Sequence, residues 1–144
     1  MMQQKVNISI ETPKWSFVKR NELGKVDLYS PLPSPFHYGR VQSLQHGNTQ
    51  PTDVQGGDGD PLDALLLDSS TYQYGDVVEA FVVGVVRFID KDQRDDKWIL
   101  SSVPEVSWYD KAKIALFFHN YALIKKIATR RKDSKVEDIV YFSK

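Results

Sequence analysis

The stretch Gly56–Leu67, which reads GGDGDPLDALLL, constrains the fold of this chain more than any other. It places three carboxylates within six residues and then continues as an apolar run. The glycines allow the backbone to turn and to approach a ligand closely, while Pro61 fixes its own φ and favours an extended Asp60. The apolar run is typical of a buried strand. One face of that strand would carry Leu62, Ala64 and Leu66, and the other Asp63, Leu65 and Leu67.

Carboxylates crowded at the mouth of a buried strand repel one another, and a hard cation such as Mg²⁺ or Mn²⁺ would relieve that repulsion. Strict alternation sends Asp58 and Asp60 to one side and Asp63 to the other, so a shared site requires a kink near Pro61. A polar Gly/Asp turn without a metal is the competing interpretation. An EF-hand loop starting at Asp58 is excluded, because its sixth and twelfth positions are Asp63 and Ser69 rather than glycine and glutamate.

Composition limits the classes of protein to which the chain can belong. Its 144 residues suit one domain, residues 1–144, and 41% hydrophobic residues suffice for a core. Lys plus Arg and Asp plus Glu each number 19, which argues against a nucleic-acid partner. The chain contains no cysteine, no apolar run of membrane-spanning length and no signal-peptide core near its start. We therefore expect a cytoplasmic protein without a membrane partner.

The periodicity of the sequence changes from that of strands to that of a helix between about residues 106 and 131. Alternating or continuous apolar patterns predict strands at residues 6–11, 14–20, 26–29, 62–67, 77–89, 98–103 and 139–142, with a bulge or bend at Gly84. Residues 45–53 and 90–97 are expected to be loops. Apolar residues at three- and four-residue steps predict an amphipathic helix within 106–131. These elements indicate an α+β fold, a small OB-like antiparallel β-barrel packed by a long C-terminal helix.

The acidic stretch at 58–63, DGDPLD, resembles the signature of the soluble family I inorganic pyrophosphatases, in which three aspartates bind divalent metals. A second acidic segment, between two predicted strands, would alone be a solvated turn. The family carries an aspartate after a Val-Gly-Val strand, another aspartate five residues on and a lysine two further. This chain has Val83–Val85, Asp90, Asp95 and Lys97 at that spacing. Two carboxylate loops with matching spacing are more specific than one.

The end of the first predicted strand adds to the resemblance. Glu11, Pro13 and Lys14 match a glutamate, a proline and a phosphate-binding lysine of the family. Several residues fewer separate Pro13 from Lys14 here. The family's second glutamate, two residues after the lysine, is Ser16 in this chain.

Two aromatic segments extend the resemblance to residue 121. Residues 35–39, PFHYG, resemble the family's Pro-x-Asn-Tyr-Gly, with Tyr38 as the tyrosine and His37 in place of asparagine. Residues 117–121, FFHNY, resemble a Phe-Phe-x-x-Tyr helix whose tyrosine contacts phosphate, and the lysine that follows it is Ala122 here. The three histidines lack metal-ligand spacing, so we interpret them as incidental.

Other departures remove part of the family's cationic phosphate cradle. The phosphate-binding arginine falls at Leu28, the tyrosine of a Tyr-Pro pair at Ser34, and the acid after the fourth aspartate at Lys91. The hypothesis that follows is substitution by another cation, with Arg40, Lys19, Arg20 and Lys125 as candidates.

The resemblance implies a role for each matching residue. Asp58, Asp63 and Asp90 would be the main metal ligands, with Asp95 beside them and Glu11 in support. Asp60 would act on the nucleophilic water as base or orienter, with Lys14 and Tyr38 also counted as catalytic. Lys14, Lys97, Tyr38, Tyr121 and Arg40 would hold the phosphates. Without the resemblance, Tyr121 would be interpreted as a core residue and the lysines as solvated.

Together these features predict an inorganic diphosphatase that hydrolyses pyrophosphate by metal-activated water, with Mg²⁺ as cofactor and Mn²⁺ as an alternative. One competing interpretation is a related hydrolase of another phosphoanhydride, such as a nucleotide or polyphosphate. Another is a non-catalytic binding module built on a small barrel, which the neutral charge and the acidic clusters disfavour. The resemblance also implies a homo-oligomer.

Overall fold

The structure is a computed structural model, and it describes residues 5–14, 18–20, 26–29, 35–44, 51–53, 62–90, 93–94, 96–129 and 135–142. Side chains are described for 5–14, 35–42, 62–88, 96–123 and 135–142. The elements of this part of the chain are β1 (Lys5–Thr12), β2 (Val18–Arg20), β3 (Val26–Tyr29), β4 (His37–Leu44), β5 (Pro51–Asp53), β6 (Asp63–Leu67), β7 (Val77–Asp90), β8 (Gln93–Arg94), β9 (Lys97–Ser101), α1 (Trp108–Thr129) and β10 (Lys135–Tyr141).

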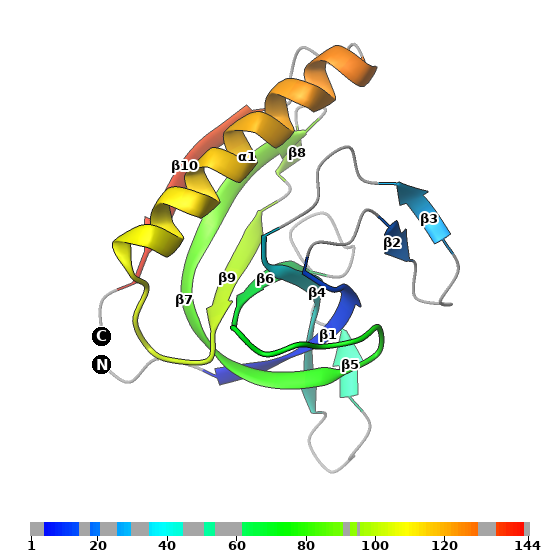
Figure 1. Cartoon of the computed structure of the whole chain (residues 1–144), viewed down its shortest axis with the longest axis vertical. Helices are drawn as coiled ribbons and strands as arrows, with labels where there is room; N and C mark the ends of the chain where they lie inside the picture. The colour runs from blue at the N-terminus through cyan, green and yellow to red at the C-terminus, as the bar shows by residue number, and fades with distance from the viewer. Residues whose placement is uncertain are drawn as a thin grey trace.

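Five strands form a closed barrel, shown in Figure 1. They pair in the order β1, β4, β6, β9 and β7, and β7 pairs back onto β1. Neighbours run antiparallel except β6 and β9, which are parallel. A parallel pair needs a long connection, which the chain supplies by running through β7 between the two strands. The predicted barrel packed by a C-terminal helix is confirmed, with one parallel pair where an entirely antiparallel sheet was expected.

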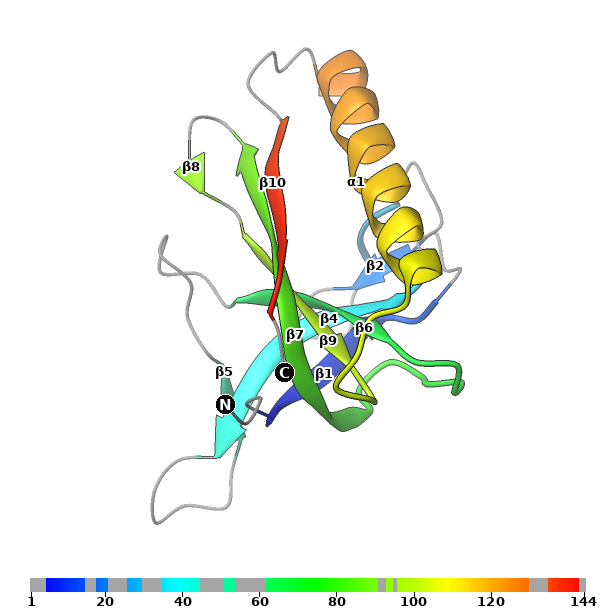
Figure 2. The same cartoon turned by 90° about the vertical axis from the view of Figure 1, so that its left-hand side faces the viewer.

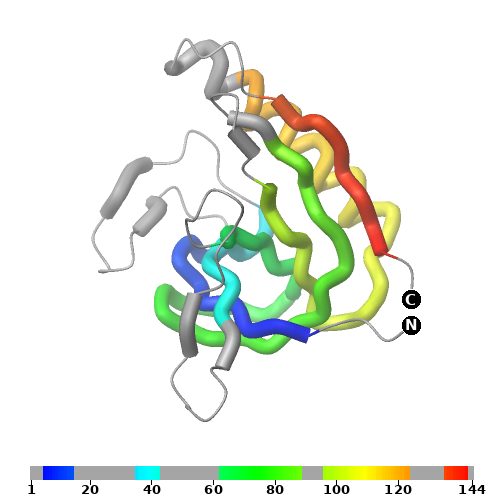
Figure 3. Tube along the Cα trace, turned by 180° about the vertical axis from the view of Figure 1, so that it is seen from behind, coloured from blue at the N-terminus to red at the C-terminus, as the bar shows by residue number. Residues whose placement is uncertain are grey.

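Strand β7 holds the barrel and the helix layer together. Its 14 residues curve round the barrel and continue beyond it beside β10, as Figure 3 shows. Its pairing with β9 shifts register between Val82 and Gly84, which confirms the predicted irregularity at this glycine. A Cβ on Gly84 would lie 2.5 Å from the Val140 carbonyl oxygen, so glycine allows β10 to approach.

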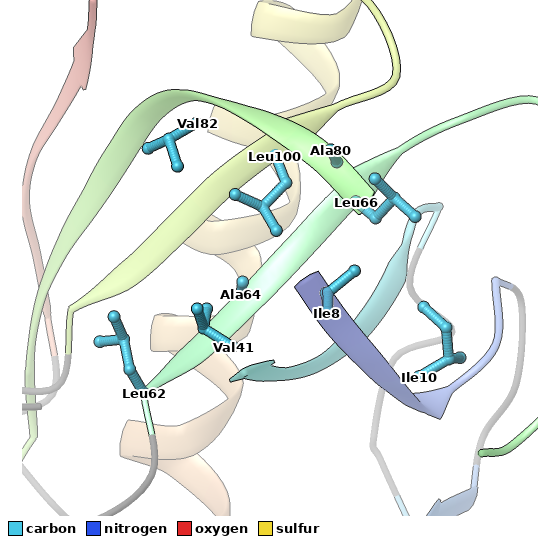
Figure 4. Close-up of a cluster of buried hydrophobic side chains, with 9 residues drawn as sticks. All are labelled: Ile8, Ile10, Val41, Leu62, Ala64, Leu66, Ala80, Val82 and Leu100. Atoms are coloured by element: carbon cyan, nitrogen blue, oxygen red, sulfur yellow. The ribbon is translucent and has the colours of Figure 1, made fainter. Parts of the chain in front are cut away.

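Two hydrophobic clusters occupy opposite faces of the barrel strands. The first, drawn in Figure 4, includes Leu62, Ala64 and Leu66. The second includes Leu65 and Leu67 together with side chains of α1. The alternation predicted for residues 62–67 is therefore correct, and it divides β6 between the two clusters.

Helix α1 covers the second cluster, and Figure 2 shows it beside β7 and β10. Ile114 and Phe118 are buried on its inner face, in agreement with the predicted amphipathic pattern. The Ser107 hydroxyl accepts a hydrogen bond from the Asp110 backbone N–H at 3.1 Å and so caps the first turn. This cap explains why the helix begins at Trp108 rather than near 106. Among the described residues, no helix combines the length and apolar character needed to cross a membrane.

Some predicted loops contain short strands. Residues 51–53 pair with β4 as β5, and residues 93–94 fold back on β7 as β8. Backbone pairing holds these polar segments, and hydrophobic periodicity cannot reveal such pairing. The last strand begins at Lys135 rather than 139, because its backbone pairs with β7 from Ile89 back to Gly84. The predictions for 15–17, 21–25, 30–34 and 45–50 lie outside the described residues.

His37, interpreted from sequence as incidental, is a buried link between two segments. Its Nδ1 accepts a hydrogen bond from the Lys14 backbone N–H at 3.0 Å, so the ring proton lies on Nε2, which donates to the Ser70 carbonyl at 2.9 Å. The Tyr72 hydroxyl and the Ser70 N–H donate to the Asp68 carboxylate at 2.6 and 2.9 Å. His37 thereby ties the end of β1 to the turn after β6.

Burial lowers the pKa of His37, and the nearby Lys14 charge acts in the same direction. Because the folded-state pKa lies below the unfolded value, the neutral ring stabilises the protein above about pH 6.5, and this contribution is lost as pH falls further. We expect the stability advantage of the wild type over His37→Asn to narrow between about pH 7 and pH 5. Urea denaturation at both pH values measures this difference in the free energy of unfolding. A difference that does not change with pH would contradict the role of neutral His37 in joining β1 to the turn after β6.

Gly39 of β4 sets the distance between β1 and β4, since a Cβ there would overlap the Ser9 carbonyl oxygen. We expect Gly39→Ala to lower the free energy of unfolding by about 3 kcal/mol, because backbone must move. Gly75→Ala is the matched control. Gly75 has a φ of 90° and open space around it, so only backbone strain of about 1–2 kcal/mol applies. Equal losses in urea denaturation would show that β1 and β4 are not closely held there.

Candidate functional site

Four charged side chains lie on neighbouring barrel strands and form what we call the charged row: Glu11 of β1, Arg40 of β4, Asp63 of β6 and Lys97 of β9. Arg40 lies directly opposite Asp63 in the β4–β6 register. Cross-strand partners share a face, so these two side chains emerge together. Asp63 also shares its face with Leu65 of the helix-covered cluster. The charged row is thus the polar continuation of the surface on which α1 packs.

The row alternates negative and positive charge. The Arg40 Nε lies 3.6 Å from Glu11 Oε1, and the Lys97 Nζ lies 3.3 Å from Asp63 Oδ2. The Glu11 and Lys97 side chains are 8% and 7% exposed, Arg40 16% and Asp63 23%. Charges buried to this degree need partners, and removing one member of a buried pair costs about 3–5 kcal/mol. Asp63 is the most exposed of the four.

Tyr38 borders the charged row. The Lys97 Nζ lies 6.0 Å from the centroid of its ring, within the range of a cation–π contact. Tyr38 is paired with Thr12 of β1 and Leu65 of β6. The structure therefore brings together five of the sequence-predicted site residues, namely Glu11, Tyr38, Arg40, Asp63 and Lys97.

Lys14 points to a different place. Its ammonium donates a hydrogen bond to the Asp68 carbonyl at 3.4 Å, in line with the tie that His37 makes to the same turn. It lines a cavity of about 310 Å³ whose described lining also includes Ser101, Asp110 and Lys113. The lining of this cavity contains no member of the charged row.

Tyr121 is packed as an aromatic side chain of α1. Its ring stacks on Phe117 with centroids 5.8 Å apart and lies 6.1 Å from the Phe88 ring at the end of β7. Ala122, at the position of the family lysine, is buried. The described surroundings of Tyr121 are those of a core residue at the edge of the apolar cluster, and its predicted role toward phosphate stays a prediction.

The remaining acidic predictions fall outside the described side chains. Asp58, Asp60 and Asp95 lie outside the described residues, and of Asp90 only the backbone is described, at the end of β7 and paired with Gln93. Asp63 therefore represents the first acidic loop at the mouth of β6. Its neighbour after the second acidic loop is Lys97, the first residue of β9.

Glu11 and Asp63 supply the described carboxylate oxygens that could hold a divalent cation. Oxygen donors of this kind suit Mg²⁺ and Mn²⁺, so the donor chemistry fits the predicted metal. Within the described residues no group of three or more His, Asp or Glu side chains gathers as a metal cluster. This agrees with the sequence, because four of the six predicted acidic residues have side chains outside that part of the chain.

The structural roles of two residues, His37 and Asp96, could not be predicted from the sequence. His37 was missed because its signal, a position beside Tyr38 in a strand, is shared by any strand histidine. Asp96 accepts a hydrogen bond from the Phe88 backbone N–H at 3.3 Å and so links the second acidic loop to β7. In the sequence this aspartate is one of several in a charged segment, and nothing distinguishes it.

Comparison with known proteins places these observations in a family. Residues 3–139 match the family model described as inorganic pyrophosphatase. The inorganic pyrophosphatase of Saccharolobus solfataricus is 29% identical over 137 residues, which span 81% of this chain and 73% of that protein. That of Geobacillus stearothermophilus is 30% identical over 121 residues, which span 75% of this chain and 67% of that protein.

A solved structure agrees with the sequence matches. The crystal structure of the inorganic pyrophosphatase from Thermus thermophilus superimposes with a TM-score of 0.73 at 28% identity, over 95% of this chain and 82% of that one. The agreement covers the barrel and the helix, which carry the charged row and the apolar face beside it. The family match spans both acidic loops and every described member of the row. The chain therefore belongs to the inorganic pyrophosphatase family.

Proposed function

We propose that this chain is an inorganic diphosphatase that hydrolyses pyrophosphate to two phosphates with Mg²⁺, Mn²⁺ being an alternative. The observation that carries the proposal is the charged row, in which carboxylates and cations alternate on adjacent strands of a barrel belonging to the inorganic pyrophosphatase family. Such a surface offers oxygens to a cation and N–H donors to phosphate within the same few ångströms.

The acidic side chains would create the metal site. Glu11 and Asp63 hold their carboxylates on the barrel wall, and Asp58, Asp90 and Asp95 would complete the set from the two acidic loops. A bound divalent cation neutralises phosphate oxygens and lowers the pKa of bound water. Asp60 would accept a proton from the nucleophilic water, or orient it, which is the role that the family resemblance implies.

The cationic and phenolic side chains would bind the phosphates. Lys97 lies beside Asp63, and Arg40 beside Glu11, so a donor accompanies each described carboxylate. Tyr38, whose ring centroid lies 6.0 Å from the Lys97 Nζ, would add a hydroxyl, and Tyr121 would add another from α1. Lys14 would need to leave the Asp68 carbonyl in order to contribute. Donors held in place in this way stabilise charge that builds up on the phosphate oxygens.

Three further predictions have not been tested by the fold. A cytoplasmic location is expected from the composition of the sequence, and a homo-oligomeric assembly from the family resemblance. Hydrolysis of a nucleotide or polyphosphate is the second candidate function, and the specific observation that favours it is the buried Ala122 where the family carries a lysine. A binding site with fewer cations around the phosphates would be less selective for pyrophosphate over a larger phosphoanhydride.

The test is phosphate release from pyrophosphate with Mg²⁺, comparing the wild type with Asp63→Asn. We expect the variant to lose at least about 100-fold in rate and to need more Mg²⁺ for half-maximal rate, because it lacks a carboxylate that would hold the metal. Asp68→Asn is the matched control. Asp68 lies five residues further on, accepts from Tyr72 and Ser70, and is not part of the charged row.

Equal rates for the two variants would contradict the role of Asp63. If the wild type releases no phosphate from pyrophosphate but does so from a nucleoside triphosphate or polyphosphate, the second candidate function replaces the first.

A further inference from the structure

The position of Arg40 between two carboxylates has a consequence for metal binding. Strand β4 lies between β1 and β6, and its Arg40 faces Ser9 on one side and Asp63 on the other. The guanidinium contacts Glu11 at 3.6 Å. Arg40 therefore stands between the two carboxylates to which a divalent cation would bind.

A cation at this place competes with a metal ion. Glu11 gains a favourable interaction from Arg40, and a divalent cation that binds the same carboxylate is repelled by the guanidinium. The site is largely buried, so solvent screens this repulsion only weakly. Arginine does not lose its proton in proteins, so the conflict cannot be relieved by deprotonation.

Phosphate oxygens would resolve the conflict. The planar guanidinium matches a phosphate bidentately, and a metal that neutralises Glu11 would weaken the pairing of that carboxylate with Arg40. The chain carries leucine, Leu28, where the family carries its phosphate-binding arginine. Of the four cations considered as substitutes, Arg40 is the one whose side chain is described, and it lies within the charged row.

We propose that Arg40 has two successive partners: it is the counter-ion of the acidic site without metal, and the phosphate-binding donor once metal and pyrophosphate are present. This inference rests on the proposed function. It makes the two ligands interdependent, since Arg40 opposes the metal when pyrophosphate is absent and favours pyrophosphate when the metal is bound. Arg40 then replaces the phosphate-binding arginine that the family carries at the position of Leu28, and it also sets the affinity of the site for the metal.

The experiment measures two affinities of the same variant. Calorimetry of Arg40→Gln with Mn²⁺ alone should show binding about tenfold tighter than in the wild type, because a repulsive charge is gone. In saturating Mn²⁺, binding of methylenediphosphonate should weaken by at least about 30-fold, because a charge-assisted contact is lost. Opposite shifts in the two affinities are the signature of this role, and a merely structural role would weaken both.

Two variants serve as controls. Arg40→Lys keeps the charge but loses the fork, so Mn²⁺ affinity should stay at the wild-type value while diphosphonate binding weakens to an intermediate degree. Lys5→Gln removes an exposed cation at the start of β1, far along the strand from Glu11, where the Lys5 Nζ lies 3.7 Å from the Glu79 carboxylate of β7. This variant should change neither affinity.

Weaker binding of both ligands by Arg40→Gln, or no change in either, would overturn the inference. Arg40→Lys keeps it testable if the glutamine variant does not fold, since loss of Mn²⁺ affinity in the lysine variant would also overturn it. Phosphate release by the wild type, measured in parallel, separates this failure from failure of the proposed function.

Discussion

The protein holds four charges close together on a largely buried surface. The alternation of their signs offsets the desolvation cost of burying them. Each carboxylate of the charged row has a cation within 3.3 to 3.6 Å. If either cation were absent, a buried carboxylate would lack compensation. In the function we propose, a metal ion and a phosphate group would replace these internal partners one for one.

Backbone pairing places these charges. Cross-strand register brings Arg40 opposite Asp63, and the close approach of β1 and β4 at Gly39 brings Glu11 within reach of the guanidinium. The apolar residues on either side of β6 fix which way Asp63 points, because one cluster fills the barrel and the other supports α1. The orientation of Asp63 therefore follows from the packing of the two hydrophobic clusters on opposite faces of β6.

Much of the fold was predictable because strands and helix carry distinct periods. The alternation after Pro61 assigned Asp63 to the face of Leu65, and the structure agrees. Strands β5 and β8 were not predictable, since backbone hydrogen bonds hold them. The motif resemblance identified four residues that meet with Arg40, but spacing alone could not predict that Lys14 points toward Asp68. Nor could it show that His37 is buried, because a histidine carries little hydrophobic signal.

If the charged row binds both the divalent metal ion and the diphosphate group, a crystal containing Mn²⁺ and methylenediphosphonate should show it directly in an anomalous difference map. We expect a manganese peak at the Asp63 carboxylate and phosphonate oxygens against Lys97 and Arg40. Manganese and diphosphonate bound elsewhere, with the Glu11–Arg40 and Asp63–Lys97 pairs intact, would contradict it.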